Sequence, residues 1–153
     1  MFATSARCVD MTTSIDTNIL VALWDKEEPL SPAVWPALDA ALGRGSLVVA
    51  APVYGELLAF PPRSESFLDQ FFSDTGIFVD WNLNESVWRA AGRAFQASAV
   101  RRRKHRDPGP HRILADFLIG AHALHNGYSL LTLDERFFHS AFPDLPLVKV
   151  KNK

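Results

Sequence analysis

Short apolar runs typical of β-strands alternate along this sequence with longer segments whose apolar residues recur at helical spacing. The strand-like runs are Ser14–Ile15, Leu47–Ala51, Ile77–Trp81, Ser129–Leu133 and Leu147–Val150. The first helical segment follows Asn18, and the second spans Ser31–Leu42. The third begins at Pro52, and the fourth spans Glu65–Phe72. The fifth runs from Glu85 into Arg101–Arg106, and the sixth spans Ile113–Asn126. This order predicts an α/β fold with a parallel sheet, whose ligands bind outside the carboxyl ends of the strands.

The length and composition indicate one compact domain. A chain of 153 residues, 48% of them hydrophobic, can bury a core without disulfides and is not of the disordered class. Cys8 is the only cysteine, which excludes an internal disulfide and a cysteine-based zinc site and fits the cytoplasm. Residues 1–12 read as a loose extension before a domain at 13–150, and Met11 is an alternative start. We expect neither export nor membrane insertion.

The near-neutral net charge of −1 conceals an uneven distribution. The run Arg101–Arg106 (RRRKHR) holds five of the 16 basic residues, so the rest of the chain is acidic. Such a basic patch on an acidic body can hold a polyanion while carboxylates elsewhere bind metal. A solvated helix end explains the run equally well.

Four carboxylates fall where the ends of predicted strands meet the starts of predicted helices. Asp16 and Asp134 follow strands, whereas Glu56 and Asp116 lie in the opening turns of helices. Each acid alone is more simply explained as helix-cap or turn chemistry. All four, however, are set in apolar runs, where an isolated buried acid is costly.

These carboxylates converge on one crevice if the two helices start at the same edge of the sheet. Four close carboxylates cannot all stay ionised without cations, so they imply raised pKa values or a bound divalent metal. Oxygen-only ligands favour Mg²⁺ or Mn²⁺. A metal of this kind suits phosphodiester hydrolysis, because it activates water and screens charge on the attacking and leaving oxygens.

Four segments, in this order and spacing, resemble the PIN-domain family, especially the VapC-type toxins. They are SIDTNIL (14–20), VYGELLA (53–59), ADFLIGAHAL (115–124) and TLD (132–134). The resemblance covers Thr13–Val150. It implies a three-layer α/β/α sandwich with a central parallel sheet, dependence on Mg²⁺ or Mn²⁺, cleavage of RNA and a homodimer.

The same resemblance implies roles for individual residues. It assigns catalysis and metal binding to the four acids: Asp16, Glu56, Asp116 and Asp134. Thr17, Asn18 and Thr132 match polar positions beside those acids, and we expect them to orient the carboxylates by hydrogen bonds.

Several other residues are considered for a functional role. Arg101, Arg102 and Arg103 are candidates for RNA binding. Arg112 precedes Asp116 by one helical turn, so pairing with that acid, contact with substrate phosphate and simple solvation all remain open. Two histidines three apart, at positions 122 and 125, do not have the spacing of a helical zinc pair. The tryptophans and phenylalanines are better explained by core packing or a dimer face than by base stacking.

The favoured function is therefore a metal-dependent endoribonuclease inhibited by a small antitoxin protein. One alternative is an RNA-processing PIN nuclease without an antitoxin. The other is a catalytically silent PIN-like module that binds RNA or protein. Nucleotide-binding and serine-hydrolase motifs are missing from the sequence, and Asn18 stands where an aspartyl phosphatase would have its second acid.

Overall fold

The computed structural model describes residues 11–59, 63–105 and 112–151, and these form one parallel sheet covered by helices. The sheet order is β3-β2-β1-β4-β5. The strands are β1 (Thr13–Ile15), β2 (Leu47–Ala50), β3 (Phe78–Asp80), β4 (Ser129–Leu131) and β5 (Leu147–Val148). All four strand pairs are parallel, as the sequence predicts.

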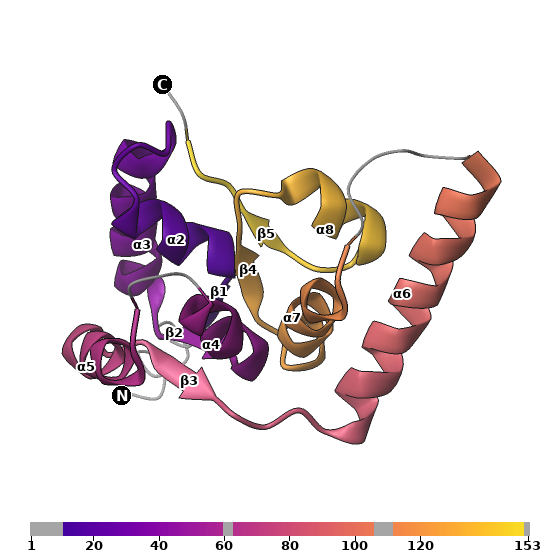
Figure 1. The fold of residues 1–153 in the computed structure, drawn as a ribbon, viewed down its shortest axis with the longest axis horizontal. Helices are drawn as coiled ribbons and strands as arrows, with labels where there is room; N and C mark the ends of the chain where they lie inside the picture. Colours follow the sequence, from indigo (N-terminus) through magenta and orange to yellow (C-terminus); the bar gives the residue numbers. More distant parts are fainter. Residues whose placement is uncertain (1–10, 60–62, 106–111, 152–153) are drawn as a thin grey trace, which may run out of the picture.

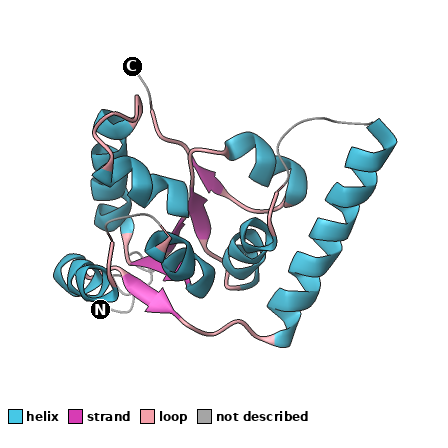
Figure 2. Ribbon diagram, in the orientation of Figure 1, coloured by secondary structure: helices cyan, strands magenta, loops and turns pink. Residues whose placement is uncertain are grey.

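The helices lie on both sides of this sheet. They are α2 (Thr17–Trp24), α3 (Ser31–Arg44), α4 (Ala51–Leu58), α5 (Glu65–Thr75), α6 (Glu85–His105), α7 (Leu114–His125) and α8 (Glu135–Ala141). In Figures 1 and 2, α2 and α3 cover one face, α7 and α8 cover the other, and α6 packs along the outside of α7. The prediction of a three-layer α/β/α sandwich is confirmed. No helix among the described residues is long and apolar enough to cross a bilayer.

Local signals explain where the helices begin and end. The Ser64 hydroxyl caps α5 by accepting the Phe67 N–H at 3.1 Å, and Gly76, with a φ of 73°, ends that helix in the left-handed conformation. The Asn84 side chain caps α6 by accepting the Val87 N–H at 3.0 Å. Capping interactions therefore set where these helices begin and end, while the interiors of the helices follow the apolar pattern of the sequence.

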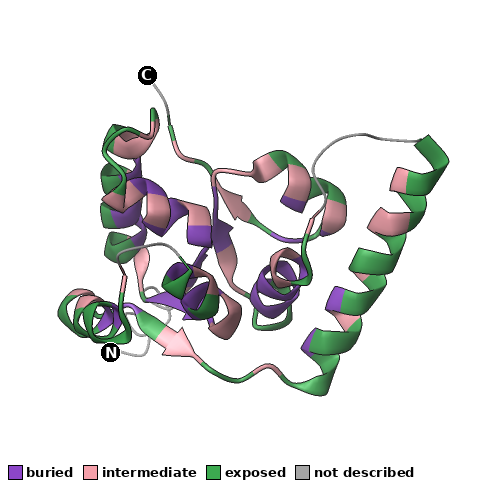
Figure 3. Cartoon of the chain, viewed as in Figure 1, coloured by how far each residue is buried: buried purple, intermediate pink, exposed green. Residues whose placement is uncertain are grey.

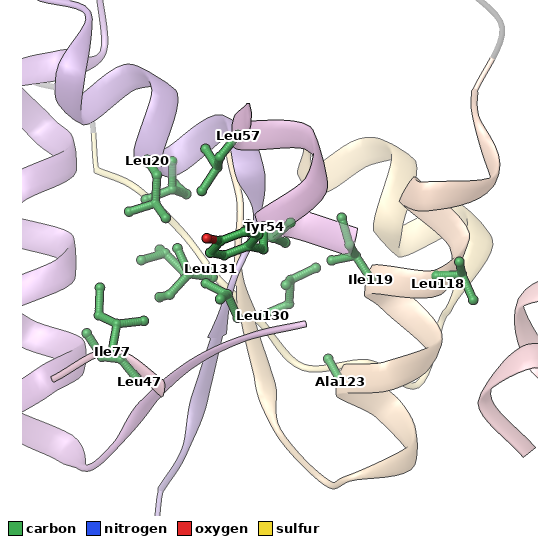
Figure 4. Close-up of a cluster of buried hydrophobic side chains, with 14 of the residues drawn as sticks. Leu20, Leu47, Tyr54, Leu57, Ile77, Leu118, Ile119, Ala123, Leu130 and Leu131 are labelled. Carbon is green, nitrogen blue, oxygen red and sulfur yellow. The ribbon is translucent and has the colours of Figure 1, made fainter. Parts of the chain in front are cut away.

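The core lies between the sheet and its flanking helices, and the strands are largely buried (Figure 3). Leu57, Ile119, Leu130 and Leu131 are fully buried (Figure 4). On α7, a Cβ at Gly120 would lie 2.4 Å from Cε2 of Phe142. Only glycine therefore allows α7 to pack this closely against the segment that precedes β5.

Some sequence expectations are corrected. The predicted strands at residues 77–81, 129–133 and 147–150 are shorter, and α8 was not predicted at all. On α6 only Val87 and Ala91 are buried; Trp88 and Phe95 have exposed fractions of 47% and 38%, although the Phe95 ring still packs 4.9 Å from the ring of the buried Phe117 on α7. The extension at 1–10, Arg106 and the loop at 107–111 lie outside the described residues.

Candidate active site

Asp16 is the most constrained of the predicted acids. It follows β1 directly and caps α2, where its Oδ1 accepts the Thr17 N–H at 2.8 Å. Its Oδ2 accepts the Thr132 hydroxyl at 2.7 Å, and only 5% of the residue is exposed. The parallel neighbours β1 and β4 end at the same edge of the sheet, so Asp16 and Thr17, which follow β1, meet Thr132, which follows β4.

Burial raises the pKa of Asp16 to about 7. The hydrogen bonds from Thr132 and Thr17 act in the opposite direction, and the nearby Asp116 and Glu56 carboxylates raise the pKa further. Desolvation therefore outweighs the hydrogen bonds that favour the ionised form. Without a cation, this carboxyl is poised to hold a proton near neutral pH.

Glu56 reaches the same place from the second turn of α4. It is half-buried, and its Oε1 accepts the Thr17 hydroxyl at 2.5 Å. Burial raises the pKa of Glu56 and the Asp116 carboxylate raises it further, whereas the Thr17 hydrogen bond lowers it. Thr17 thus joins Asp16 and Glu56 through its backbone and its side chain, in the orienting role that was expected of it.

Asp116 lies in the first turn of α7. Its Oδ2 accepts the Ile113 N–H at 3.3 Å, which caps the start of the helix. Burial raises the pKa of Asp116; the Ile113 hydrogen bond and the Arg112 charge oppose this, and Asp134 adds to it. Asp116 therefore combines an ordinary capping role with an electrostatic link to the other acids.

Asp134 is the N-cap residue of α8, and it is paired with Arg112. The Arg112 Nη2 contacts the Asp134 Oδ2, and the guanidinium carbon lies 4.4 Å from the centre of the Phe137 ring. The Asp134 N–H donates to the Thr132 hydroxyl oxygen at 2.9 Å. Thr132 therefore connects Asp134 to Asp16. An Arg112–Asp116 ion pair, one of the open possibilities, is not formed, because Arg112 precedes the first turn of α7.

Asn18 holds the loop after β4 against the start of α2, because its Oδ1 accepts the Leu133 N–H at 3.2 Å. Through this bond and those of Thr132, the loop after β4 is held beside the start of α2. Thr17 and Thr132 therefore donate hydrogen bonds to two of the acids, whereas Asn18 binds the backbone of the loop instead of orienting a carboxylate.

All four predicted acids line one pocket with a volume of about 330 Å³. Thr17, Asn18 and Arg112 also line it, and so does Glu28, which sequence reasoning missed. Glu28 lies in the charged stretch 25–29, where nothing distinguishes it from its acidic neighbours, and its Oε1 accepts the Leu30 N–H at 3.3 Å. The pocket thus holds five carboxylates and one arginine.

This donor set suits a hard divalent cation, because all of the acidic ligands are oxygens and burial raises the pKa values of three of them, Asp16, Glu56 and Asp116. As they are placed, however, no three His, Cys, Asp or Glu side chains in the described part of the chain are grouped tightly enough to hold an ion. Thr17 holds Glu56, Arg112 holds Asp134, and Asp116 caps its own helix. The residues fit a metal in chemistry and need side-chain rotation to bind one.

The predicted RNA-binding arginines divide into two groups. Arg112 lines the acidic pocket. Arg101 and Arg103 are exposed in the last turns of α6, the outermost helix in Figure 1, and Arg102 is partly buried and has a contact of its own. None of these three lines the pocket.

One buried polar pair was not anticipated. His122 is fully buried on α7, and its Nε2 lies 2.8 Å from Oδ2 of Asp80 at the end of β3. Desolvation acts to raise the pKa of Asp80, but the hydrogen bond with His122 prevails and lowers it. His122 thus packs as a core residue that ties α7 to the edge strand. His125 instead lies with Nε2 3.1 Å from the Asn84 amide nitrogen.

The comparison with known families covers the elements that form this pocket. A family model of the PIN domain matches residues 14–143. The chain belongs to the PIN-domain family. No curated protein matches the sequence of this PIN domain.

Several solved structures share the fold at low sequence identity. VapBC2 from Rickettsia felis, bound to a promoter DNA fragment, is 18% identical with a TM-score of 0.60, and the match covers 92% of this chain and 100% of that chain. VapBC-1 from nontypeable Haemophilus influenzae is 22% identical, with a TM-score of 0.59 and coverages of 93% and 100%. A toxin–antitoxin complex from Klebsiella pneumoniae is 15% identical, with a TM-score of 0.58 and coverages of 92% and 99%.

Proposed function

We propose that this PIN domain is an Mg²⁺- or Mn²⁺-dependent endoribonuclease and the toxin of a toxin–antitoxin pair. The observation that carries the proposal is the single pocket where carboxylates from β1, α4, α7 and the loop after β4 meet. Membership of the PIN family supports a nuclease. The likeness to a toxin–antitoxin complex supports the toxin role and a small antitoxin partner.

In this proposal Asp16, Glu56, Asp116 and Asp134 hold the metal. When bound, the metal supplies an activated water and screens the charge on the phosphodiester oxygens. The protein's own contribution is to orient these ligands. Thr132 and the Thr17 N–H fix the plane of the Asp16 carboxylate through two hydrogen bonds, and Thr17 directs Glu56 toward it.

Metal binding and proton release are coupled in such a site. Burial raises the pKa of Asp16 to about 7, so at neutral pH this carboxyl keeps part of a proton that a cation must displace, and burial raises the pKa values of Glu56 and Asp116 in the same direction. Metal affinity, and with it cleavage, should therefore rise with pH through the range near 7. The Arg112–Asp134 pair must also open if Asp134 is to become a ligand.

Cleavage of a mixed RNA pool tests the proposal, with wild type compared with Asp16→Asn and Asp116→Asn in Mg²⁺, Mn²⁺ or EDTA. Both variants should stay folded and lose cleavage by several orders of magnitude, while RNA binding, which rests on phosphate contacts, should change little. Asp39→Asn is the matched control, because Asp39 is exposed on α3. Cleavage retained in both pocket variants would rule out this metal site.

A catalytically silent PIN module is the second candidate. It is favoured by the ion pair between Arg112 and Asp134 and by the absence of a tight group of metal ligands among the described residues. It predicts no cleavage by wild type in either metal, and unchanged melting temperature on adding Mn²⁺. The expected homodimer is tested separately by light scattering of the purified protein.

A further inference from the structure

A second and larger hollow lies away from the acidic pocket, between α3 and the end of β5. This groove has a volume of about 860 Å³. Three prolines and three alanines, which include Pro32, Ala33, Pro36 and Ala37, form an apolar wall with Val148. Because these side chains are short or rigid, the groove can receive apolar groups with little loss of side-chain entropy.

The charged residues of the groove are all cationic. Among the described residues, Arg44, Lys149 and Lys151 line it, and no acidic residue does. The Arg44 Nη2 is buried and has no hydrogen-bond partner in the part of the chain that the structure describes. The Lys149 ammonium lies 3.8 Å from a Glu135 carboxylate oxygen, but the lysine is exposed and the glutamate partly so, and such pairs are weak. The exposed Lys149 and Lys151 therefore offer donors that an anionic group can satisfy.

The groove and the acidic pocket are neighbours with opposite charge. Glu28 lines the acidic pocket, and the next residue, Pro29, lines the groove. A molecule seated in the groove would therefore touch the turn that carries one of the pocket's carboxylates. The two sites differ in chemistry and cannot prefer the same ligand.

We propose that this groove binds an acidic, amphipathic segment of a partner protein. The segment's apolar side chains lie against the prolines and alanines, and its carboxylates pair with Arg44, Lys149 and Lys151. The inference stands on the groove's own geometry and does not depend on the nuclease activity proposed above.

The lining favours a peptide over RNA. Cations alone would serve carboxylates and phosphates equally, because arginine pairs with both. Single-stranded RNA, however, is usually held by stacking on aromatic rings as well as by phosphate contacts, and no aromatic residue among those described lines the groove. Pro36 also lies inside α3 and has no N–H, so the carbonyl of Pro32 lacks its usual helical donor. A peptide can supply that N–H, whereas a phosphodiester cannot.

Selection of short random peptides displayed on phage tests the proposal, with the wild-type protein and two variants as bait. Lys149→Glu/Lys151→Glu reverses two exposed charges of the groove. Arg101→Glu/Arg103→Glu makes the same charge change at the exposed end of α6. Wild type and the α6 variant should enrich peptides that interleave Asp or Glu with apolar residues. The groove variant should bind those peptides about tenfold less tightly or worse and enrich basic peptides instead.

The site of binding is read from the methyl resonances of alanine-labelled protein. A selected acidic peptide should shift the signals of Ala33, Ala37 and Ala40. The proposal is wrong if no acidic peptide is enriched, if the two variants select the same peptides, or if the shifts lie elsewhere. It is also wrong if a single-stranded RNA of about ten nucleotides, and not the peptide, loses affinity in the groove variant.

Discussion

The raised pKa of Asp16 makes the stability of the metal-free domain depend on pH. This pKa is about 7, against an ordinary value of 3.8, because the carboxyl is buried. The folded state therefore binds a proton that the unfolded state releases near pH 4. The stabilisation is complete below the unfolded pKa and is lost as pH rises through 7. A difference of about 3 units corresponds to about 4 kcal/mol of unfolding free energy.

Asp16→Asn removes this dependence, because the amide is neutral at every pH and its oxygen can still accept the Thr17 N–H. Urea unfolding in EDTA, followed by tryptophan fluorescence, measures the effect. Between about pH 5 and pH 8, wild type should lose about 3 kcal/mol relative to Asp16→Asn. Glu56 and Asp116 add their own pH dependence to both proteins, so the difference reports Asp16 together with its coupling to these two acids. Asp39→Asn, an exposed control, should follow wild type.

Adding metal should reverse the order of stability of wild type and Asp16→Asn. At a hundredfold excess over its Kd, Mn²⁺ stabilises a protein that binds it by about 2.7 kcal/mol, and Asp16→Asn should gain less. In EDTA at pH 8 the variant is then the more stable protein, and in Mn²⁺ the advantage narrows or passes to wild type. A helix cap alone would give no such crossover. If the two proteins respond equally to pH and to Mn²⁺, the assignment of Asp16 to an acidic metal site is refuted.

Three further changes probe the pocket, the basic helix end and the core. Arg112→Gln should raise Mn²⁺ affinity in titration calorimetry because it frees a carboxylate, and an unchanged affinity would show that the ion pair does not compete with metal. Neutralising arginines 101–103 should reduce the salt slope of RNA binding by about 0.7 for each lost phosphate contact, and an unchanged slope would leave a solvated helix end. Gly120→Ala should cost about 1–3 kcal/mol in urea unfolding because the new methyl meets the Phe142 ring. Gly43→Ala, in open space, should cost nothing.

The positions of the acids could be predicted because parallel topology leaves little freedom. Once two strands run the same way, residues that follow them, such as Asp16 and Asp134, must lie at one edge. The helices that begin at that edge bring Glu56 and Asp116 there. Their convergence on one pocket follows from the order of strands and helices alone.

The interactions that sequence reasoning missed are those that depend on side-chain direction. Arg112 pairs with Asp134, 22 residues away, rather than with its near neighbour Asp116, because Arg112 lies before the helix begins. His122 meets Asp80 across the edge of the sheet, although nothing in either local sequence marks the pair. Spacing rules within one helix cannot reach contacts that the tertiary fold decides.

Basic residues are grouped differently in the folded protein and in the linear sequence. The basic run near residue 101 is obvious in the sequence, yet its described members lie on the outer helix and do not line the acidic pocket. Arg44 and Lys149 are far apart in the chain and share a groove only because β5 returns beside α3. That groove adjoins the acidic pocket through the turn at Glu28 and Pro29. The linear sequence does not group the cations of this groove, and a partner seated on them would lie at the pocket's edge without occupying it.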